Sequence, residues 1–145
     1  MDIDSKEDAV EETIKKKLRT IFEDKALRLV LFFGSLASGK GHKRSDIDLG
    51  FLFDGPIDTI ELTNRVSRAL RAENVDVVDL GCASPLLRFA AAQKSIVLYE
   101  REPGLFSHFY SLSYRMYVDT KKLRTARDRT IERFLHKSAQ GPSDS

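Results

Sequence analysis

The sequence predicts an α/β domain in which helices pack on a small sheet, followed by a long C-terminal helix. Short apolar runs alternate with amphipathic helical stretches from residue 6 to residue 99, and residues 105–136 look helical throughout. The chain has 145 residues, 41% of them hydrophobic, which is enough for one core. We therefore expect a domain at residues 1–102, a helical extension at 103–138 and a flexible tail at 139–145.

The first half of the domain begins with a helix and continues with two strands. A helix is expected at residues 6–22, where apolar residues recur at helical spacing, namely Val10, Ile14, Leu18 and Ile21. Residues 27–33 are an apolar run that ends at Gly34, a pattern typical of a buried strand. Residues 46–53 alternate and then become apolar before Asp-Gly-Pro, which predicts a second strand.

The second half repeats this alternation of helices and strands. Residues 58–73 place apolar side chains on one helical face, and residues 75–80 are a short valine-rich strand. Ser84 is a favourable N-cap, and Pro85 suits the first position of the helix that follows. Residues 96–99 predict a short fourth strand.

Charge and composition exclude several classes of protein. Lysine and arginine number 24 against 22 acidic residues, which argues against a protein dedicated to coating nucleic acid. A nucleic-acid partner is therefore not expected, although residues 115–137 are basic. No apolar run approaches the ~18 residues of a membrane span, and the charged start lacks a signal peptide's apolar stretch. The lone Cys82 excludes an internal disulfide, so we expect a cytoplasmic protein.

Two aspartates at the start of the second strand are the strongest chemical feature. Asp46 and Asp48 are two positions apart, so on a strand they share one face at roughly 6–7 Å along the chain. Two carboxylates in that position repel each other unless a cation lies between them, and hard oxygen ligands suit Mg²⁺. The alternative is an edge strand with two solvated acids.

A glycine-serine turn follows the first strand. Gly34 lets the backbone approach an anion, and the N–H groups of a helix that starts near Leu36 favour phosphate, to which Ser35 can donate a hydrogen bond. The stretch nearly matches the G-x-x-x-x-G-K-[ST] loop, but Gly41 stands where that loop has a hydroxyl. We reject this loop, and an ordinary strand-to-helix turn remains the alternative.

A third carboxylate is expected on the third strand. Asp76 and Asp79 are the candidates, and their spacing puts them on opposite faces. Asp76 lies between Val75 and Val77, and an ionisable group within an apolar run is costly unless its charge is compensated. This argument favours Asp76 as the ligand and leaves Asp79 as a solvated residue.

Together, these motifs resemble the minimal nucleotidyltransferases of the DNA polymerase β superfamily, and most closely the MntA-like antitoxins that pair with HEPN-domain toxins. The motifs are Gly34-Ser35, Asp46-Ile47-Asp48-Leu49 and Val75-Asp76-Val77-Val78. The resemblance implies a polymerase β-like fold with a mixed sheet. It further implies that two Mg²⁺ ions are bound by Asp46, Asp48 and Asp76, and that the triphosphate of ATP is held by Gly34 and Ser35.

The resemblance also implies an activity, the transfer of AMP from ATP to a hydroxyl with release of pyrophosphate. In the antitoxin members the acceptor is a tyrosine of the HEPN toxin, and Asp76 would take the hydroxyl proton or orient the acceptor. Two alternatives remain, a transferase for a small molecule such as an aminoglycoside and an antitoxin that acts by binding alone. Many relatives carry a basic residue where this chain has Ser38, which Lys40, Lys43 or Arg44 could replace.

Overall fold

Four strands form one mixed sheet in the order β3-β2-β1-β4. The strands are β1 (Leu27–Phe33), β2 (Ile47–Phe53), β3 (Val75–Asp79) and β4 (Ile96–Glu100). β1 is antiparallel to both β2 and β4, whereas β2 and β3 are parallel, and this confirms the mixed sheet that the resemblance implied. The computed structural model describes residues 2–34 and 47–144.

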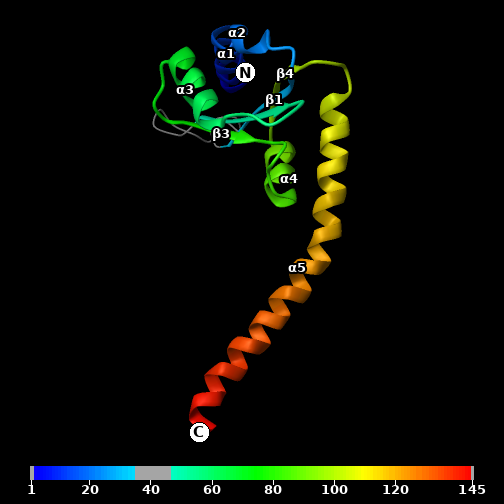
Figure 1. Ribbon diagram of the computed structural model, residues 1–145. Helices are drawn as coiled ribbons and strands as arrows, with labels where there is room; N and C mark the ends of the chain where they lie inside the picture. Colours follow the sequence, from blue (N-terminus) through cyan, green and yellow to red (C-terminus); the bar gives the residue numbers. More distant parts are fainter. Residues whose placement is uncertain (1, 35–46, 145) are drawn as a thin grey trace.

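Helices cover both faces of this sheet (Figure 1). On one face lie α1 (Asp2–Lys17), α2 (Arg19–Phe22) and α3 (Thr59–Leu70), and α3 provides the crossover that parallel pairing of β2 and β3 requires. On the other face lie α4 (Pro85–Gln93) and the first turns of α5 (Leu105–Asp144). The fold class expected from the sequence is therefore confirmed.

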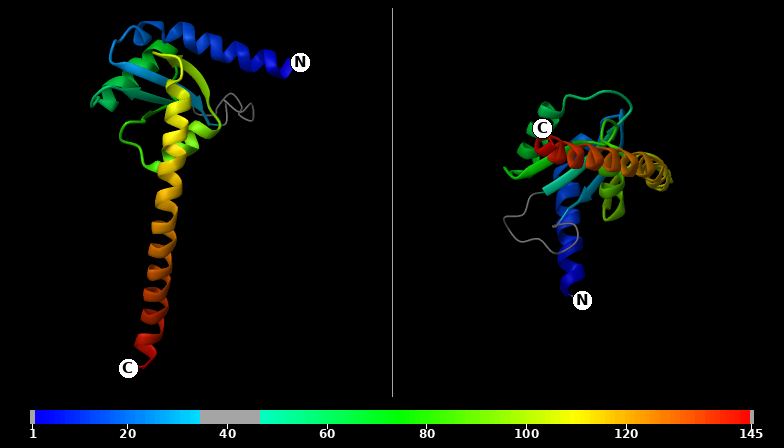
Figure 2. Two further views of the ribbon diagram at one scale, coloured as in Figure 1. Left: turned by 90° about the vertical axis from the view of Figure 1, so that its right-hand side faces the viewer. Right: turned by 90° about the horizontal axis from the view of Figure 1, so that it is seen from below.

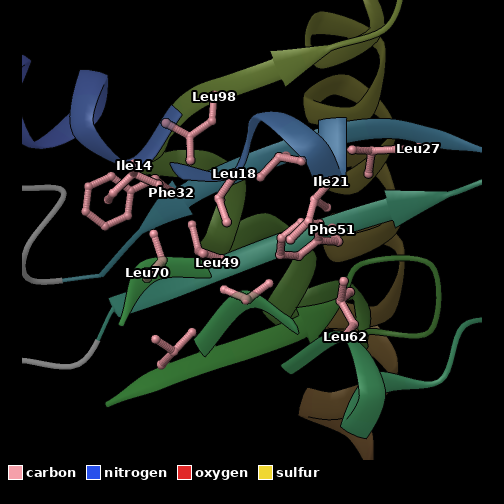
Figure 3. Close-up of a cluster of buried hydrophobic side chains, with 13 residues drawn as sticks. Ile14, Leu18, Ile21, Leu27, Phe32, Leu49, Phe51, Leu62, Leu70 and Leu98 are labelled. Atoms are coloured by element: carbon pink, nitrogen blue, oxygen red, sulfur yellow. The ribbon is translucent and has the colours of Figure 1, made fainter. Parts of the chain in front are cut away.

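The core has two layers because side chains alternate along each strand. The layer under α1, α2 and α3 includes Leu18, Phe32, Leu49 and Phe51, all of which are fully buried (Figure 3). The layer under α4 and α5 is built from Leu29 and Leu31 of β1, Leu80, and further apolar residues of both helices. This second layer occupies the face of the sheet that also carries the candidate site.

The N-terminal helical region differs from the expected helix over residues 6–22. It forms two helices that meet at Leu18, where the N–H of Ile21 bonds the carbonyl oxygen of Leu18, three residues back, at 2.9 Å. This tighter turn begins α2, for which Leu18 is the N-cap, and both Leu18 and Ile21 lie in the core.

α3 is shorter than the helix expected at residues 58–73. It begins after Asp58, whose side chain accepts a hydrogen bond from the N–H of Glu61, and it ends at Leu70 because Arg71 adopts a left-handed conformation with a φ of 52°.

α5 leaves the domain on the side of α4 and extends far beyond it (Figures 1 and 2). The helix includes residues 139–144, which we expected to be a frayed tail. The division into a domain at 1–102, an extension at 103–138 and a flexible tail at 139–145 stays a prediction. No helix within residues 2–34 and 47–144 combines the length and hydropathy that crossing a bilayer requires.

Candidate active site

Asp48 and Asp76 lie side by side on adjacent strands. They are register partners in the parallel pair of β2 and β3, and adjacent strands are about 4.8 Å apart. Asp48 alternates with the core residue Leu49 along β2, so its side chain leaves the sheet on the face of α4 and α5. Asp76 shares that face with Val78, which packs under α4 and α5. The sheet therefore brings two of the three predicted carboxylates together.

The two carboxylates differ in exposure. Asp48 is half-buried and Asp76 is exposed. The two valines that flank Asp76 in the sequence do not enclose it, because β3 is an edge strand whose Val75 and Val77 turn to the opposite face and pack on the core there. Exposure leaves the Asp76 carboxylate accessible to a substrate.

Asp79 is engaged in the loop that follows β3. Its Oδ1 accepts a hydrogen bond from the N–H of Gly81 at 2.9 Å. A hydrogen bond to Asp79 also raises the pKa of the Cys82 thiol above its usual range. Asp79 lies on the face opposite to Asp76, as its spacing predicted, and it has a local structural role.

Gly34 joins the site through a close approach of its backbone to Asp48. It has a φ of 89°, a conformation that residues with a side chain rarely adopt, and a Cβ at this position would overlap the Asp48 carboxylate. The preceding Phe33 is the register partner of Asp48 across β1 and β2, which explains the proximity. Only glycine fits here, for a reason that is independent of any bound anion.

The remaining predicted site residues lie outside the described part of the chain. They are the phosphate-binding candidate Ser35, the carboxylate Asp46, and the loop residues Ser38, Lys40, Lys43 and Arg44. Within the described part, no group of three or more His, Cys, Asp and Glu side chains is placed to hold a metal ion. The triad of Asp46, Asp48 and Asp76 therefore stays a prediction.

The donor set nevertheless suits a hard divalent cation. Two carboxylates on neighbouring backbone positions repel each other, and the repulsion grows as water is excluded. A cation that both carboxylates bind turns this repulsion into attraction, and Mg²⁺ prefers such oxygen ligands. Asp48 and Asp76 are thus chemically fit to hold Mg²⁺ close to the Gly34 turn.

One residue that supports the site was not singled out from the sequence. Gly50 follows Asp48 by two residues on the same face, and a Cβ on Gly50 would lie 2.9 Å from a methyl carbon of Leu80. The missing side chain lets the fully buried Leu80 pack directly against β2. A glycine inside a strand pattern is the signal that points to such close packing.

The family to which this fold belongs is shown by its match to a known family. A family model described as polymerase beta, nucleotidyltransferase, matches residues 16–104. The chain belongs to this nucleotidyltransferase family. The match spans all four strands, and with them Gly34, Asp48 and Asp76.

Relatives within the family are similar over most of the chain. A protein adenylyltransferase MntA of Aphanizomenon flos-aquae is 25% identical over 132 residues, which cover 83% of this chain and 88% of the relative. A toxin–antitoxin crystal structure with AMP-PNP is similar with a TM-score of 0.67 and 30% identity, covering 86% of this chain and 98% of that one. A structure of tri-AMPylated Shewanella oneidensis HEPN toxin in complex with MNT antitoxin is similar with a TM-score of 0.63 and 26% identity. The similarity covers 89% of this chain and 98% of that one.

Proposed function

We propose that this chain is a Mg²⁺-dependent protein adenylyltransferase that moves AMP from ATP to a tyrosine hydroxyl of a HEPN toxin and thereby acts as its antitoxin. The observation that carries the proposal is the pairing of Asp48 with Asp76 beside Gly34, in a chain that aligns with an MntA adenylyltransferase along most of its length. The reaction consumes ATP, so we place it in the cytoplasm.

The bond changes of the proposed reaction are simple. The acceptor hydroxyl oxygen forms a bond to the α-phosphorus of ATP, the bond from that phosphorus to the bridging oxygen breaks, and pyrophosphate leaves. The hydroxyl proton needs an acceptor, and the exposed carboxylate of Asp76 is accessible to take it. Asp48, held against the Gly34 backbone, has the more constrained position and suits a fixed metal ligand.

We assign two Mg²⁺ ions to this site, with Asp48 and Asp76 as ligands together with Asp46. When bound, Mg²⁺ would balance the carboxylate charges and stabilise the negative charge that develops on the phosphate oxygens. The backbone at Gly34 and the hydroxyl of Ser35 are assigned to the triphosphate. The protein's own contribution is to hold the carboxylates on one face of the sheet before substrate arrives.

The test is transfer of a labelled nucleotide. The purified chain is incubated with its HEPN toxin, Mg²⁺ and ATP labelled at the α-phosphate, and the labelled residue is mapped by mass spectrometry. We expect label on a toxin tyrosine, none when EDTA is present, and about a 100-fold or greater loss for Asp48→Asn, since metal catalysis contributes several kcal/mol. A folded, ATP-binding protein that labels no toxin would refute the proposal.

The same variant separates catalysis from neutralisation by binding. Asp48→Asn keeps the size of the side chain and removes its charge, so the complex with the toxin should still form. If cells that express the toxin are protected by the wild type and killed with Asp48→Asn, neutralisation requires transfer. Full protection by the variant would instead favour an antitoxin that acts by covering its partner.

A further inference from the structure

The apolar face with which α5 packs on the domain extends along the helix past the last contact with the domain. Phe109 and Ser113 are buried on this face, and Tyr117 stacks on Phe89 of α4 with ring centroids 4.9 Å apart. Leu123 follows at the same helical spacing, 14 residues after Phe109. It is 71% exposed.

A second pair of exposed side chains lies beside this face of the same helix, where the Tyr114 ring also touches Phe89 of α4 with ring centroids 5.5 Å apart. Tyr114 and Val118 are one turn apart and are both exposed, at 53% and 38%. They line a surface hollow of about 410 Å³ together with Arg115 and Asp119. Three large side chains, Tyr114, Val118 and Leu123, are therefore exposed on α5 where it leaves the domain.

The length of α5 makes this exposure costly. The part from Val118 to Asp144 spans about 40 Å at the rise of an α-helix, and the figures show it projecting away from the sheet. A helix without tertiary contacts is only marginally stable in water, because most helical stability in proteins comes from packing. A partner that packs along this segment would supply what the domain does not.

Charge indicates which kind of partner fits. Residues 115–137 contain eight basic and three acidic residues, a net charge of +5, and Arg115, Arg129 and Arg133 are exposed. Two copies of this helix packed together would repel each other. Nucleic acid would match the charge but would leave Val118 and Leu123 without apolar contacts. A protein surface with acidic residues around an apolar strip satisfies both features.

The position of α5 relative to the candidate site indicates which protein the partner is. Asp48 and Asp76 leave the sheet on the face that α4 and α5 cover, and α5 projects on that same side (Figure 1). An acceptor hydroxyl must approach this face to reach the carboxylates. A protein bound along α5 is thus on the side from which the acceptor has to come.

We propose that the arm of α5, residues 114–133, is the docking surface for the acceptor protein of the transferase reaction, and that the acceptor presents an acidic surface with an apolar strip. This inference rests on the proposed function for the identity of the acceptor. The apolar side chains of Val118 and Leu123 provide affinity, and the bases of the arm provide orientation and speed of association.

The experiment measures binding of the HEPN toxin by titration calorimetry with the full chain. The test variant is Val118→Asp/Leu123→Asp, which changes two exposed side chains. The matched control is Ile60→Asp, because Ile60 is 77% exposed on α3, on the opposite face of the sheet. We expect at least a tenfold loss of toxin affinity for the test variant and less than a twofold change for the control. Melting temperature and AMP-PNP affinity should stay unchanged in both.

A second variant addresses charge. Arg129→Glu/Arg133→Glu should also weaken toxin binding, and its affinity should fall less steeply with added salt than that of the wild type. These measurements require no catalysis. If the wild type transfers no AMP, the proposed function fails while the binding comparison still tests the docking surface.

Three outcomes would overturn the docking proposal. Toxin affinity of both arm variants could equal that of the wild type. The variants could lose only binding to a 20-nucleotide RNA, which would make the arm a nucleic-acid site. Light scattering could show that the wild type is a dimer and the Val118→Asp/Leu123→Asp variant a monomer with unchanged toxin affinity, which would make the arm a self-association surface.

Discussion

Asp48 of β2 and Asp76 of β3 occupy directly paired positions across parallel strands, so two carboxylates project from neighbouring points of one sheet face. A sheet gains nothing in stability from such a pair, since like charges placed side by side are destabilising. The arrangement is informative for that reason. It identifies a place where two acidic side chains start from neighbouring backbone positions, an arrangement that suits a divalent cation.

This pairing predicts opposite effects of one substitution on stability and on activity. In EDTA, Asp76→Asn should leave the free energy of unfolding unchanged or raise it by up to about 1 kcal/mol, because it removes one of two like charges. With Mg²⁺ and ATP, the same variant should lose AMP transfer by about 100-fold or more. Urea unfolding and toxin labelling measure the two effects.

Asp79→Asn is the matched control for Asp76→Asn. It is an equally conservative change on the same strand, but the side chain lies on the other face, where its oxygen accepts the N–H of Gly81. The asparagine retains an acceptor oxygen, so transfer activity should stay within about twofold of the wild type. Equal losses of activity in the two variants would contradict the assignment of Asp76 to the site.

Alanine substitutions at three glycines distinguish two causes of destabilisation, a positive φ and a steric clash of the added Cβ. Gly34 has both a φ of 89° and a clash with Asp48, whereas Gly104 has a φ of 92° and open space around it. Gly55 has neither. Substitution by alanine should cost about 1 kcal/mol at Gly104, clearly more at Gly34, and little at Gly55. Chemical denaturation of the three variants provides the ranking.

The AMP transfer activity of these three alanine variants should not follow the order of their stability. Only the Gly34→Ala variant displaces the Asp48 carboxylate, so it alone should impair AMP transfer under conditions where all three proteins are folded. A Gly104→Ala variant with an equal loss of transfer would show that the defect comes from general destabilisation.

An ion pair at the opposite end of the sheet predicts a pH dependence of stability. Arg101 donates two hydrogen bonds to Asp54, at 2.7 and 3.2 Å, and a third to the carbonyl oxygen of Lys25. The Arg101 guanidinium lowers the pKa of the Asp54 carboxyl below its usual range. A lowered pKa means that the stabilisation is present above the pKa of the unfolded chain, about 3.9, and is lost as the pH falls through the lower folded value.

The expected result is a difference in melting temperature that disappears in acid. Asp54→Asn should melt below the wild type at pH 7, and the two should converge as the pH falls below about 4. Glu102→Gln is the control. The Glu102 carboxylate lies 3.7 Å from the Arg101 guanidinium, which is longer than the hydrogen bonds that Arg101 donates to Asp54. A constant difference between Asp54→Asn and the wild type from pH 7 to pH 2.5 would contradict this explanation.

Gly50 and Leu80 should show energetic coupling. Gly50→Ala places a methyl group 2.9 to 3.0 Å from the Leu80 side chain, and overpacking of this kind costs about 1 to 3 kcal/mol. Leu80→Ala should cost about 2 to 5 kcal/mol by leaving a cavity. The double variant should be more stable than the sum of the two effects predicts, because the added methyl occupies part of that cavity. Additive effects in urea unfolding would disprove the contact.

The local elements could be predicted because burial leaves a periodic trace in the sequence. The apolar run that predicted a strand at residues 27–33 corresponds residue for residue to β1, and Ser84 and Pro85 correctly located the start of α4. The break at Leu18 could not be foreseen, since the apolar spacing continues unchanged through it while the backbone tightens.

The site required information that is not local. The sequence identified Asp48 and Asp76 as candidates, but the parallel register that makes them partners depends on how β2 and β3 align through α3. The exposure of Asp76 was missed because two flanking valines suggest burial, and only the position of β3 at the sheet edge reverses that reading. Whether a strand lies at the edge or in the centre depends on the order of all strands in the sheet.

The 40-residue length of α5 has a consequence for how this protein behaves in solution. A small body with a rod attached experiences more friction than a sphere of the same 16.4 kDa mass. A monomer will therefore elute early from a gel-filtration column calibrated with globular standards, at a volume that suggests a dimer. Its sedimentation coefficient will be correspondingly low, while the mass from light scattering will remain that of one chain.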